Sequence, residues 1–432
     1  MISVIKNATI VTQNAQRKIL PTASIVVEDG IIKKISTRNI PKRAFEKEID
    51  ASGYILFPGF INAHVHLGES IYKSFLPQNL SLQGYLKATE NIVKKSPLIE
   101  NSRGVVNNYS LMLLLKSGTT TVCGGRTMET GESFGLRNIS GFMIMRSYKL
   151  GKYYDQLEFQ FAKEYLLACR SKFSKHAIFV HSLNRVDLKK LREIRNVLNK
   201  FPDTKLIIHL SETKHDEQKV KQKLGESSTR VLSKHNLLNK NTIAVHCNYV
   251  DNRDFELIKK SGATIVHCLS SNLRVDDTTL EIEKVLAKNI PICLGTDGLA
   301  TSNSLDILAE AKLVYLYHNR FGSRKVTHQK VFDMITIDAA EALGVSQEIG
   351  SVEVGKKADL VFIRKDHPLV EESDPIKSII FYAQSSMISG VMINGELKIW
   401  NGKFAKEKKL AKDFSELQEK IRKQIERKPL TF

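Results

Sequence analysis

Two histidines one residue apart stand out in the stretch FPGFINAHVHLGES, residues 57–70. The stretch begins with apolar residues typical of a buried strand, and His64 and His66 lie close to its end. Side chains on a strand alternate between its two faces, so these imidazoles are predicted to point to the same side. Paired imidazoles are one arrangement that binds a transition metal, and two hydrogen-bonded core histidines are the alternative. A metal site therefore requires further ligands elsewhere in the chain.

Further polar residues occur in the same way, each towards the end of an apolar run. His181 lies in HAIFVHSL, His209 in TKLIIHLSET, His246 in NTIAVHCNYV and Asp297 in IPICLGTDG. Imidazole nitrogens and a carboxylate from different strands suit Zn²⁺ or Fe²⁺ with one position left for water, whose pKa the metal lowers to about 7. Hydrolysis also needs a group that moves protons. Glu212, three residues after His209, could do this, and a solvated loop glutamate is the alternative.

The elements that must position these residues alternate regularly between residues 59 and 350. Eight short, nearly continuous apolar runs are typical of parallel strands covered on both faces, and amphipathic stretches such as LKKLREIRNVLNKF predict helices between them. Eight β units in βα alternation predict a closed (β/α)₈ TIM barrel, in which the chemistry lies at the C-terminal ends of the strands. The histidines and the aspartate lie at those ends, which predicts one common site.

Both ends of the chain have a different sequence pattern, in which short alternating segments predict β-strands. ISVIKNATIVT and ASIVVEDGIIKKIS, with a hairpin-like Asp29–Gly30, occur at the start, and GSVEVGKKADLVFIRKD and SGVMINGELKIWNGKF near the end. We therefore expect residues 1–58 and 351–400 to form one small, composite β-sandwich domain. In residues 401–432, apolar residues recur at helical spacing and predict a C-terminal packing helix.

The bulk composition is that of a globular protein of 432 residues, with 42% hydrophobic and 26% charged residues. The net charge is +19, but the basic residues are scattered without a basic stripe or interleaved aromatics, which argues against a nucleic-acid partner. No run approaches the roughly 20 apolar residues of a membrane span, and residues 1–14 lack a signal-peptide pattern. We therefore expect no membrane partner and a cytoplasmic location. The five cysteines form no C-x-x-C pair, so a disulfide framework is not expected.

Taken together, these motifs make the sequence similar to the amidohydrolase superfamily. The similar branch contains S-adenosylhomocysteine and methylthioadenosine deaminases, aminofutalosine deaminase, guanine deaminase and the triazine hydrolases. The resemblance covers almost the whole chain and is carried by PGFINAHVH, HLSET, AVHC, HCLSSNLRV, LGTDGLATSNSLD and GSVEVGKKADLVFI.

The resemblance implies a role for each strand-end residue. It implies four ligands for one divalent metal, Zn²⁺ or alternatively Fe²⁺: His64, His66, His209 and Asp297. It further implies that Glu212 shuttles a proton to the ring nitrogen of a substrate, while His246 positions and polarises the attacking water. Asp297 would accept the proton of that water and pass it to the leaving amine.

Two features indicate the number of metals and the type of reaction expected within this branch. Binuclear relatives such as dihydroorotase bridge two metals through a carboxylated lysine on the fourth strand, and HAIFVHSL contains no lysine. The dechlorinating triazine enzyme departs from the His-x-x-Glu pattern, whereas His209 and Glu212 keep it here. One metal and displacement of an amino group are therefore expected.

The candidate substrate-binding residues are Glu69, Arg126, Arg146, His181 and Asn303. S-adenosylhomocysteine deaminase-like proteins carry a substrate-binding glutamate near LSLQGYL that this chain lacks, and a glutamate stands instead at Glu69. Arg146 and His181 match positions at which those deaminases contact their substrates. Arg126 and Arg146 could meet an anionic or carbonyl group, and surface or interdomain salt bridges are the alternative for both.

Four further histidines are not expected to be metal ligands. His267, before Cys268 on the seventh run, is expected to be a hydrogen-bonding residue of the substrate pocket. His215, His235 and His318 lack the placement at strand ends and are expected to be surface or helix residues.

The function expected is hydrolytic deamination, in which an amino group leaves a nitrogen heterocycle as ammonia, with purine nucleoside-like substrates among the candidates. Opening of a cyclic amide or imidazolone ring is the alternative. A non-catalytic scaffold resembling the dihydropyrimidinase-related neuronal proteins ranks lower, because those lose metal ligands that this chain keeps. The expected partner is a small heterocyclic substrate, and assembly into a homo-oligomer is compatible with the sequence.

Overall fold

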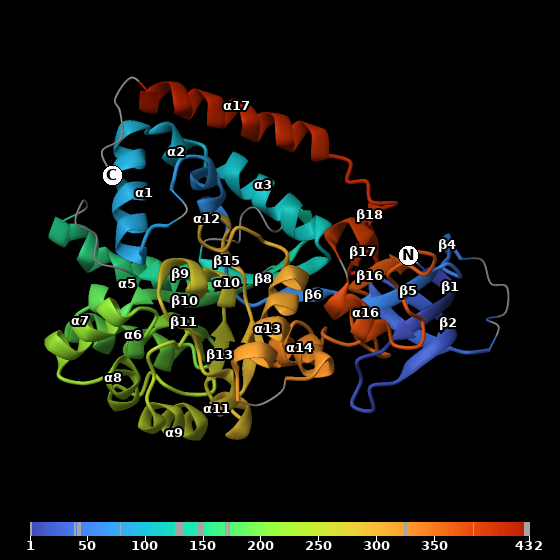
Figure 1. Ribbon diagram of the computed structural model, residues 1–432, viewed down its shortest axis with the longest axis horizontal. Helices are drawn as coiled ribbons and strands as arrows, with labels where there is room; N and C mark the ends of the chain where they lie inside the picture. The colour runs from blue at the N-terminus through green and yellow to red at the C-terminus, as the bar shows by residue number, and fades with distance from the viewer. Residues whose placement is uncertain are drawn as a thin grey trace.

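The computed structural model describes residues 2–38, 40, 45–77, 79–125, 134–144, 151–168, 171, 173–323, 326–382 and 384–426. At the centre of this part lies a sheet of eight parallel strands with helices on its outside (Figure 1). The strands follow one another in sequence order: β6 (Phe60–Asn62), β8 (Thr119–Gly125), β9 (Arg137–Ile144), β10 (Ser174–Ser182), β11 (Lys205–Leu210), β12 (Thr242–His246), β13 (Thr264–His267) and β14 (Ile292–Leu294). Each predicted apolar run thus supplies one strand.

The first and last strands close this sheet into a barrel. The Ala63 N–H donates to the Leu294 carbonyl at 3.0 Å, and the Asp297 N–H donates to the His64 carbonyl at 3.0 Å. Beyond them, β7 (Val65–His66) pairs in parallel with β15 (Asp297–Gly298). The predicted TIM barrel is confirmed, and its seam brings the histidine pair beside Asp297.

Alternate side chains of the strands fill the barrel. The buried residues of this interior include Ile61, Cys123, Ile139, Phe179, Ile207, Ile243, Val245, Val266 and Cys293. His181 follows Phe179 by two residues and His209 follows Ile207 by two, so regular alternation directs both histidines inwards above this layer. The four described cysteines are buried free thiols, in keeping with the expected lack of a disulfide framework.

Helices cover the barrel and connect its strands. In chain order they are η1 (Leu67–Ser74), α1 (Leu82–Lys95), α2 (Leu98–Asn101), α3 (Arg103–Lys116), α5 (Gly151–Ala168), η2 (Leu183–Arg185), α6 (Leu188–Lys200), α7 (Lys214–Leu224), α8 (Ser228–Lys234), α9 (Asn252–Ser261), α10 (Leu269–Val275), α11 (Ile282–Ala287), α12 (Leu299–Ser302), α13 (Ile307–Phe321), α14 (His328–Met334), α15 (Ile337–Ala342), α16 (Pro375–Phe381), η3 (Ser385–Met387) and α17 (Glu407–Glu426). Within the described ranges, none of them combines the length and apolar character needed to cross a membrane.

The helices that follow the site-bearing strands have well-defined ends, which keeps the intervening loops short. The side chain of Thr213 caps α7 and that of Asp251 caps α9, each by accepting a backbone N–H of the first turn. Both helices end at a glycine in the left-handed region, Gly225 with φ 81° and Gly262 with φ 72°. The chain therefore has little freedom between the end of β11 and the start of α7, where Glu212 lies.

The two ends of the chain share a second sheet of eight strands, beside the barrel in Figure 1. Its members are β1 (Ile2–Val11), β2 (Ile19–Glu28), β3 (Ile31–Ser36), β4 (Lys47–Asp50), β5 (Tyr54–Pro58), β16 (Leu360–Arg364), β17 (Ile388–Ile393) and β18 (Glu396–Trp400). The hydrogen-bonded sheet is continuous, and its far ends meet where Gly30 lies against Asn394. The layers of the expected sandwich are thus two parts of one curled sheet. β5 ends at Pro58, which supports the proposed boundary with the barrel domain.

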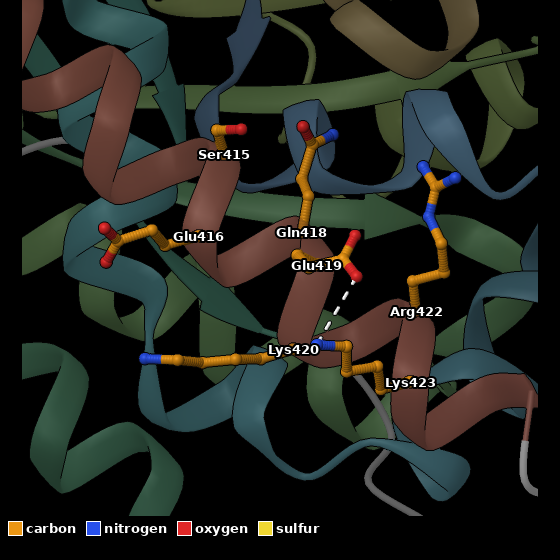
Figure 2. Close-up of a pocket in the computed structure, with 7 residues that line it drawn as sticks. All are labelled: Ser415, Glu416, Gln418, Glu419, Lys420, Arg422 and Lys423. Atoms are coloured by element: carbon orange, nitrogen blue, oxygen red, sulfur yellow. Dashed lines mark ion pairs between the residues drawn. The ribbon is translucent and has the colours of Figure 1, made fainter.

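The long helix α17 lies across α1 and α3 (Figure 1). Its buried side chains include Leu417 and Ile421, and Phe414 stacks on Tyr109 with 3.9 Å between the ring centroids. Polar and charged residues occupy another face of the helix, where Figure 2 shows Lys423 paired with Glu419. The described part of the C-terminal segment is therefore a packing helix, as the apolar spacing predicts.

Candidate active site

Three imidazole nitrogens converge at the C-terminal end of the barrel. The Nε2 atoms of His64 and His66 are 3.1 Å apart, those of His66 and His209 are 3.3 Å apart, and those of His209 and His64 are 3.1 Å apart. Oδ1 of Asp297 lies 3.5 Å from His64 Nε2 and 3.4 Å from His66 Nε2. His64 and His66 therefore point to the same side, as their spacing predicts.

These spacings fit four protein ligands around one divalent metal, which can take water as a fifth ligand. Zinc–ligand bonds of about 2.0–2.1 Å in a regular tetrahedron place the ligand atoms about 3.3 Å apart. Mutual hydrogen bonding is a poor alternative, because three neutral imidazoles that face one point cannot all supply a proton to a neighbour. Burial lowers the pKa of His64 to about 4 and that of His209 well below its ordinary value. Both rings are thus held neutral, the form that binds a metal.

Asp297 is oriented by hydroxyl groups. Ser271 Oγ donates to its Oδ2 at 2.6 Å and Thr301 Oγ1 donates to the same oxygen at 3.2 Å, which leaves Oδ1 directed at the histidines. Burial alone would raise the pKa of Asp297, but the hydrogen bond with His64 and the neighbouring histidines outweigh it and hold this pKa well below its ordinary value. A carboxylate that stays ionised in this way suits metal ligation.

Glu212 lies between two histidines without joining the converging group. Its Oε2 is 3.6 Å from Nδ1 of His209, and its Oε1 is 3.7 Å from Nε2 of His246. Glu212 is only 5% exposed, so it is not a solvated loop residue. Burial raises its pKa well above the ordinary value, and the charge of Asp297 acts in the same direction. A buried carboxyl group of this kind suits a residue that must hold and release a proton.

His209, Glu212 and His246 also form a cluster whose ligand atoms lie within 4.8 Å of one another. This cluster shares His209 with the converging group but meets it through Nδ1, at a longer distance of 3.6 Å. The expected single metal remains a prediction. β10 begins before HAIFVHSL and so contains Lys175, but this residue lies near the N-terminal end of the strand, where its Nζ is 3.7 Å from Glu348. It therefore cannot serve as a bridging lysine at the C-terminal end.

His246 faces the site because its backbone departs from strand geometry. In β12, Ile243 and Val245 point into the barrel, so regular alternation would direct His246 outwards. The φ angles of 74° at His246 and 57° at Cys247 reverse this pattern. The ring of His246 lies 5.0 Å from that of His209, whereas Cys247 joins the outer core. A left-handed non-glycine residue costs of order 1–3 kcal/mol and is typical of functional sites.

Glu69, on η1, lies within the site. The Tyr85 hydroxyl donates to its Oε2 at 2.8 Å. Its carboxylate packs so closely on Gly298 that a Cβ at that position would stand 1.9 Å from Oε2. Burial raises the pKa of Glu69 to about 7, although His66 acts in the opposite direction. Contact with the residue that follows Asp297 supports the predicted role of Glu69 in substrate binding.

The remaining candidates for substrate binding have different positions. The ring of His181 lies 4.9 Å from that of His209, and its buried Nδ1 has no hydrogen-bond partner among the described residues. Asn303 instead has an exposed side chain and ends α12 with φ 65°, a placement that gives its predicted role no support. Arg126 and Arg146 lie outside the described residues.

The other histidines do not join the ligands. The Nε2 atoms of His267 and His318 are 3.1 Å apart, and Nδ1 of His318 lies 3.2 Å from Glu283 Oε1. His318 is a helix residue on α13, one of the two expected placements, and it is buried at 2% exposure. The partner of His267 belongs to this outer helix, which does not support its expected place in the substrate pocket. His215 is exposed on α7, and His235 ends α8, as expected.

Sequence reasoning missed the residues that support the site from behind. These residues are Tyr85, Asn248, Ser271, Asn272 and Thr301. All of them lie inside motifs quoted from the sequence, including HCLSSNLRV and LGTDGLATSNSLD. The motifs marked the right segments, but local spacing does not reveal which hydroxyl or amide group meets which partner across the barrel.

A TIM barrel with three histidines and an aspartate converging at the strand ends, beside a buried acid, defines a metal-dependent hydrolase. The chain belongs to the amidohydrolase family, whose sequence model matches residues 55–398. This match confirms the predicted family and, with it, the predicted class of hydrolases that act on carbon–nitrogen bonds.

Relatives match nearly the whole chain. A 5-methylthioadenosine/S-adenosylhomocysteine deaminase of Thermodesulfovibrio yellowstonii is 30% identical over 422 residues, which cover 93% of this chain and 94% of that protein. A protein of the same name from Acetivibrio thermocellus is 29% identical over 410 residues, covering 92% and 94%. Among solved structures, an adenosine deaminase from Xanthomonas campestris with bound zinc superposes with a TM-score of 0.88, at 21% identity and 98% coverage of each chain. The structural likeness confirms the fold.

Proposed function

We propose that this protein is a zinc-dependent hydrolytic deaminase that releases ammonia from a purine nucleoside-like substrate. The observation that carries the proposal is the buried Glu212 carboxyl group, held 3.6–3.7 Å from His209 and His246 beside a converging ligand set. Deamination must place a proton on a ring nitrogen, and a buried carboxyl group in this position can deliver it. The curated deaminases that match over nine-tenths of the chain also support deamination.

We assign four ligands to a single divalent metal: His64, His66, His209 and Asp297. The convergence of three Nε2 atoms and one carboxylate oxygen supports this set. Zinc is the metal proposed, with Fe²⁺ as the alternative, because both accept imidazole and carboxylate ligands. When bound, the metal supplies a hydroxide nucleophile at neutral pH.

The proton transfers are assigned to three side chains. His246 orients the attacking water through Nε2, whose lone pair has no partner among the described residues. Glu212 delivers a proton to the ring nitrogen next to the carbon under attack, a role that its raised pKa supports. Asp297, whose pKa is depressed, holds the proton of the water only in passing before the leaving amine takes it.

Glu69 and His181 are proposed to bind the substrate. Tyr85 occupies only Oε2 of Glu69, so in the described part of the chain Oε1 has no hydrogen-bond partner and can accept a substrate hydroxyl or N–H group. This glutamate would replace the one that S-adenosylhomocysteine deaminase-like proteins carry near LSLQGYL. His181 would contact the heterocycle from the strand beside His209.

The test is ammonia release by the zinc-loaded protein. Methylthioadenosine, S-adenosylhomocysteine and adenosine form one arm, and a hydantoin and an imidazolone form the other. We expect at least one aminopurine to be converted to its oxo form with one ammonia per turnover. Ring opening of the cyclic amides without ammonia release from any aminopurine would overturn the proposal.

A further inference from the structure

A chain of side-chain amides links the backbone of Glu212 to the ring of His246. Asn248 Nδ2 donates to the Glu212 carbonyl at 2.9 Å, and Asn272 Nδ2 donates to Asn248 Oδ1 at 2.8 Å. Asn272 Oδ1 then lies 2.9 Å from Nδ1 of His246. Asn272 and His246 are both completely buried, so water does not compete for the contact between them.

The orientation of the two amide groups is set by the backbone carbonyl of Glu212. A backbone carbonyl can only accept a hydrogen bond, so Asn248 must present its NH₂ group there and its Oδ1 to Asn272. Asn272 must then direct its own NH₂ group at Asn248, and the same nitrogen also reaches Thr279 Oγ1 at 3.3 Å. Turning both amides over would set Asn248 Oδ1 against the Glu212 carbonyl, with two acceptors face to face. The oxygen of Asn272 is therefore the atom that meets His246.

The consequence for His246 concerns its tautomer. An acceptor at Nδ1 requires that this nitrogen carry the hydrogen, so in the neutral ring the lone pair lies on Nε2. Nε2 is buried without a hydrogen-bond partner among the described residues and lies 3.7 Å from Glu212 Oε1. The opposite tautomer would direct an N–H group at the site and could not accept a hydrogen bond from the attacking water.

The same contacts hold two strained loops together. Ser211, before Glu212, has φ 49°, and His246 has φ 74°. The Asn248 contact to the Glu212 carbonyl and a Tyr249 N–H donated to the Ser211 carbonyl at 3.1 Å join these loops directly. The loop that carries Glu212 and the loop that carries His246 are thus one hydrogen-bonded unit.

We infer that Asn272 and Asn248 are positioning residues, which fix His246 in the tautomer whose Nε2 lone pair faces the site and accepts a hydrogen bond from the attacking water. The inference rests on the proposed function for its catalytic meaning, but the tautomer itself is a property of the protein without substrate. Asn248 does not contact His246 through any hydrogen bond in the structure, yet it must control the tautomer by holding the Asn272 amide in one orientation.

The tautomer can be read directly by ¹⁵N NMR of the zinc-loaded protein with labelled histidine imidazoles, and the His246 signals are identified by their loss in His246→Gln. We expect the hydrogen on Nδ1 in the wild type and in Asn272→Asp, which keeps an acceptor. Asn272→Leu removes the acceptor and Asn248→Leu frees the Asn272 amide to turn, so both should show a mixed or reversed tautomer. Both should also lower kcat by roughly tenfold to hundredfold with little change in KM or zinc content.

A matched control is Asn138→Leu, which removes another buried asparagine amide, on β9, that donates to Ser174 Oγ at 2.8 Å. It should cost stability without changing the His246 tautomer or kcat. The hydrogen on Nε2 in the wild type, or an unchanged tautomer in both leucine variants, would overturn the inference even if deaminase activity is found. If Asn272→Leu does not fold, Asn248→Leu still decides the question. The expected tautomers in a protein without deaminase activity would overturn the proposed function alone.

Discussion

Replacing Glu212 by glutamine should separate proton transfer from metal binding. Glutamine has the same length, so its terminal atoms can keep the positions 3.6 Å from His209 Nδ1 and 3.7 Å from His246 Nε2. Neither of these nitrogens belongs to the converging metal site, so zinc content should stay unchanged. The amide cannot deliver a proton, and general acid–base catalysis contributes typically 10²–10⁴-fold, which is about 2.7–5.4 kcal/mol in the activation free energy.

The same variant should be the more stable protein at neutral pH when the metal is removed. Burial raises the pKa of Glu212 in the folded state above its value of about 4.3 in the unfolded chain. The contribution of this group to stability is therefore complete below about pH 4.3 and is lost as the pH rises towards the folded-state pKa. Glutamine has no such loss, so the stability advantage of Glu212→Gln should be larger at about pH 8 than at about pH 5.

The assay pairs steady-state kinetics and elemental zinc analysis with thermal unfolding of the metal-free proteins at both pH values. We expect a fall in kcat of at least about a hundredfold and one zinc ion per chain. At the higher pH, the metal-free variant should unfold at a higher temperature than the metal-free wild type. Loss of zinc would make Glu212 a ligand and refute the division of roles. Full activity would refute the role of Glu212 in proton transfer. If the wild type and the variant unfold at equal temperatures at both pH values, the pKa of Glu212 is not raised.

Three further changes test other parts of the structure. His64→Ala should lose zinc and activity together, and elemental analysis that finds two metals in the wild type would contradict a single site. Gly298→Ala would place a Cβ 1.9 Å from Glu69 Oε2, so kcat/KM should fall at least about tenfold, and unaltered kinetics would exclude Glu69 from substrate binding. Arg137→Leu leaves the Asp359 carboxylate, only 2% exposed, without its ion-pair partner and should cost about 3–5 kcal/mol in unfolding experiments, whereas Arg364→Leu at an exposed pair should leave the unfolding free energy nearly unchanged.

Strand periodicity was sufficient to predict where the candidate ligands gather. His181 and His209 follow the regular alternation of their strands, and the His64–His66 spacing correctly predicted a same-side pair. The eight apolar runs predicted the barrel because strands that are buried on both faces consist almost entirely of apolar residues.

The same periodicity fails where the backbone is left-handed. It would send His246 outwards and Cys247 inwards, and only the φ angles of 74° and 57° reverse them. Such angles carry no reliable sequence signal in residues other than glycine and asparagine, because surrounding contacts rather than local preference maintain them. The position of His246 at a strand end and the family resemblance, not periodicity, indicated its place in the site. The hydroxyl of Ser271 on Asp297 was likewise invisible, since it depends on how separate strand ends meet.

The seam of the barrel sets an order of events for a chain that is being synthesised. Asn62 and Thr296 are 234 residues apart in sequence, yet their side chains are joined by a hydrogen bond of 2.7 Å across the seam. His64 and His66 leave the ribosome early, but the proposed fourth ligand, Asp297, emerges only after all eight barrel strands have been made. A complete coordination shell therefore cannot exist before the last strand docks against the first. Bound metal would then join the first and last strands of the closed barrel, and metal uptake would indicate that the barrel has closed.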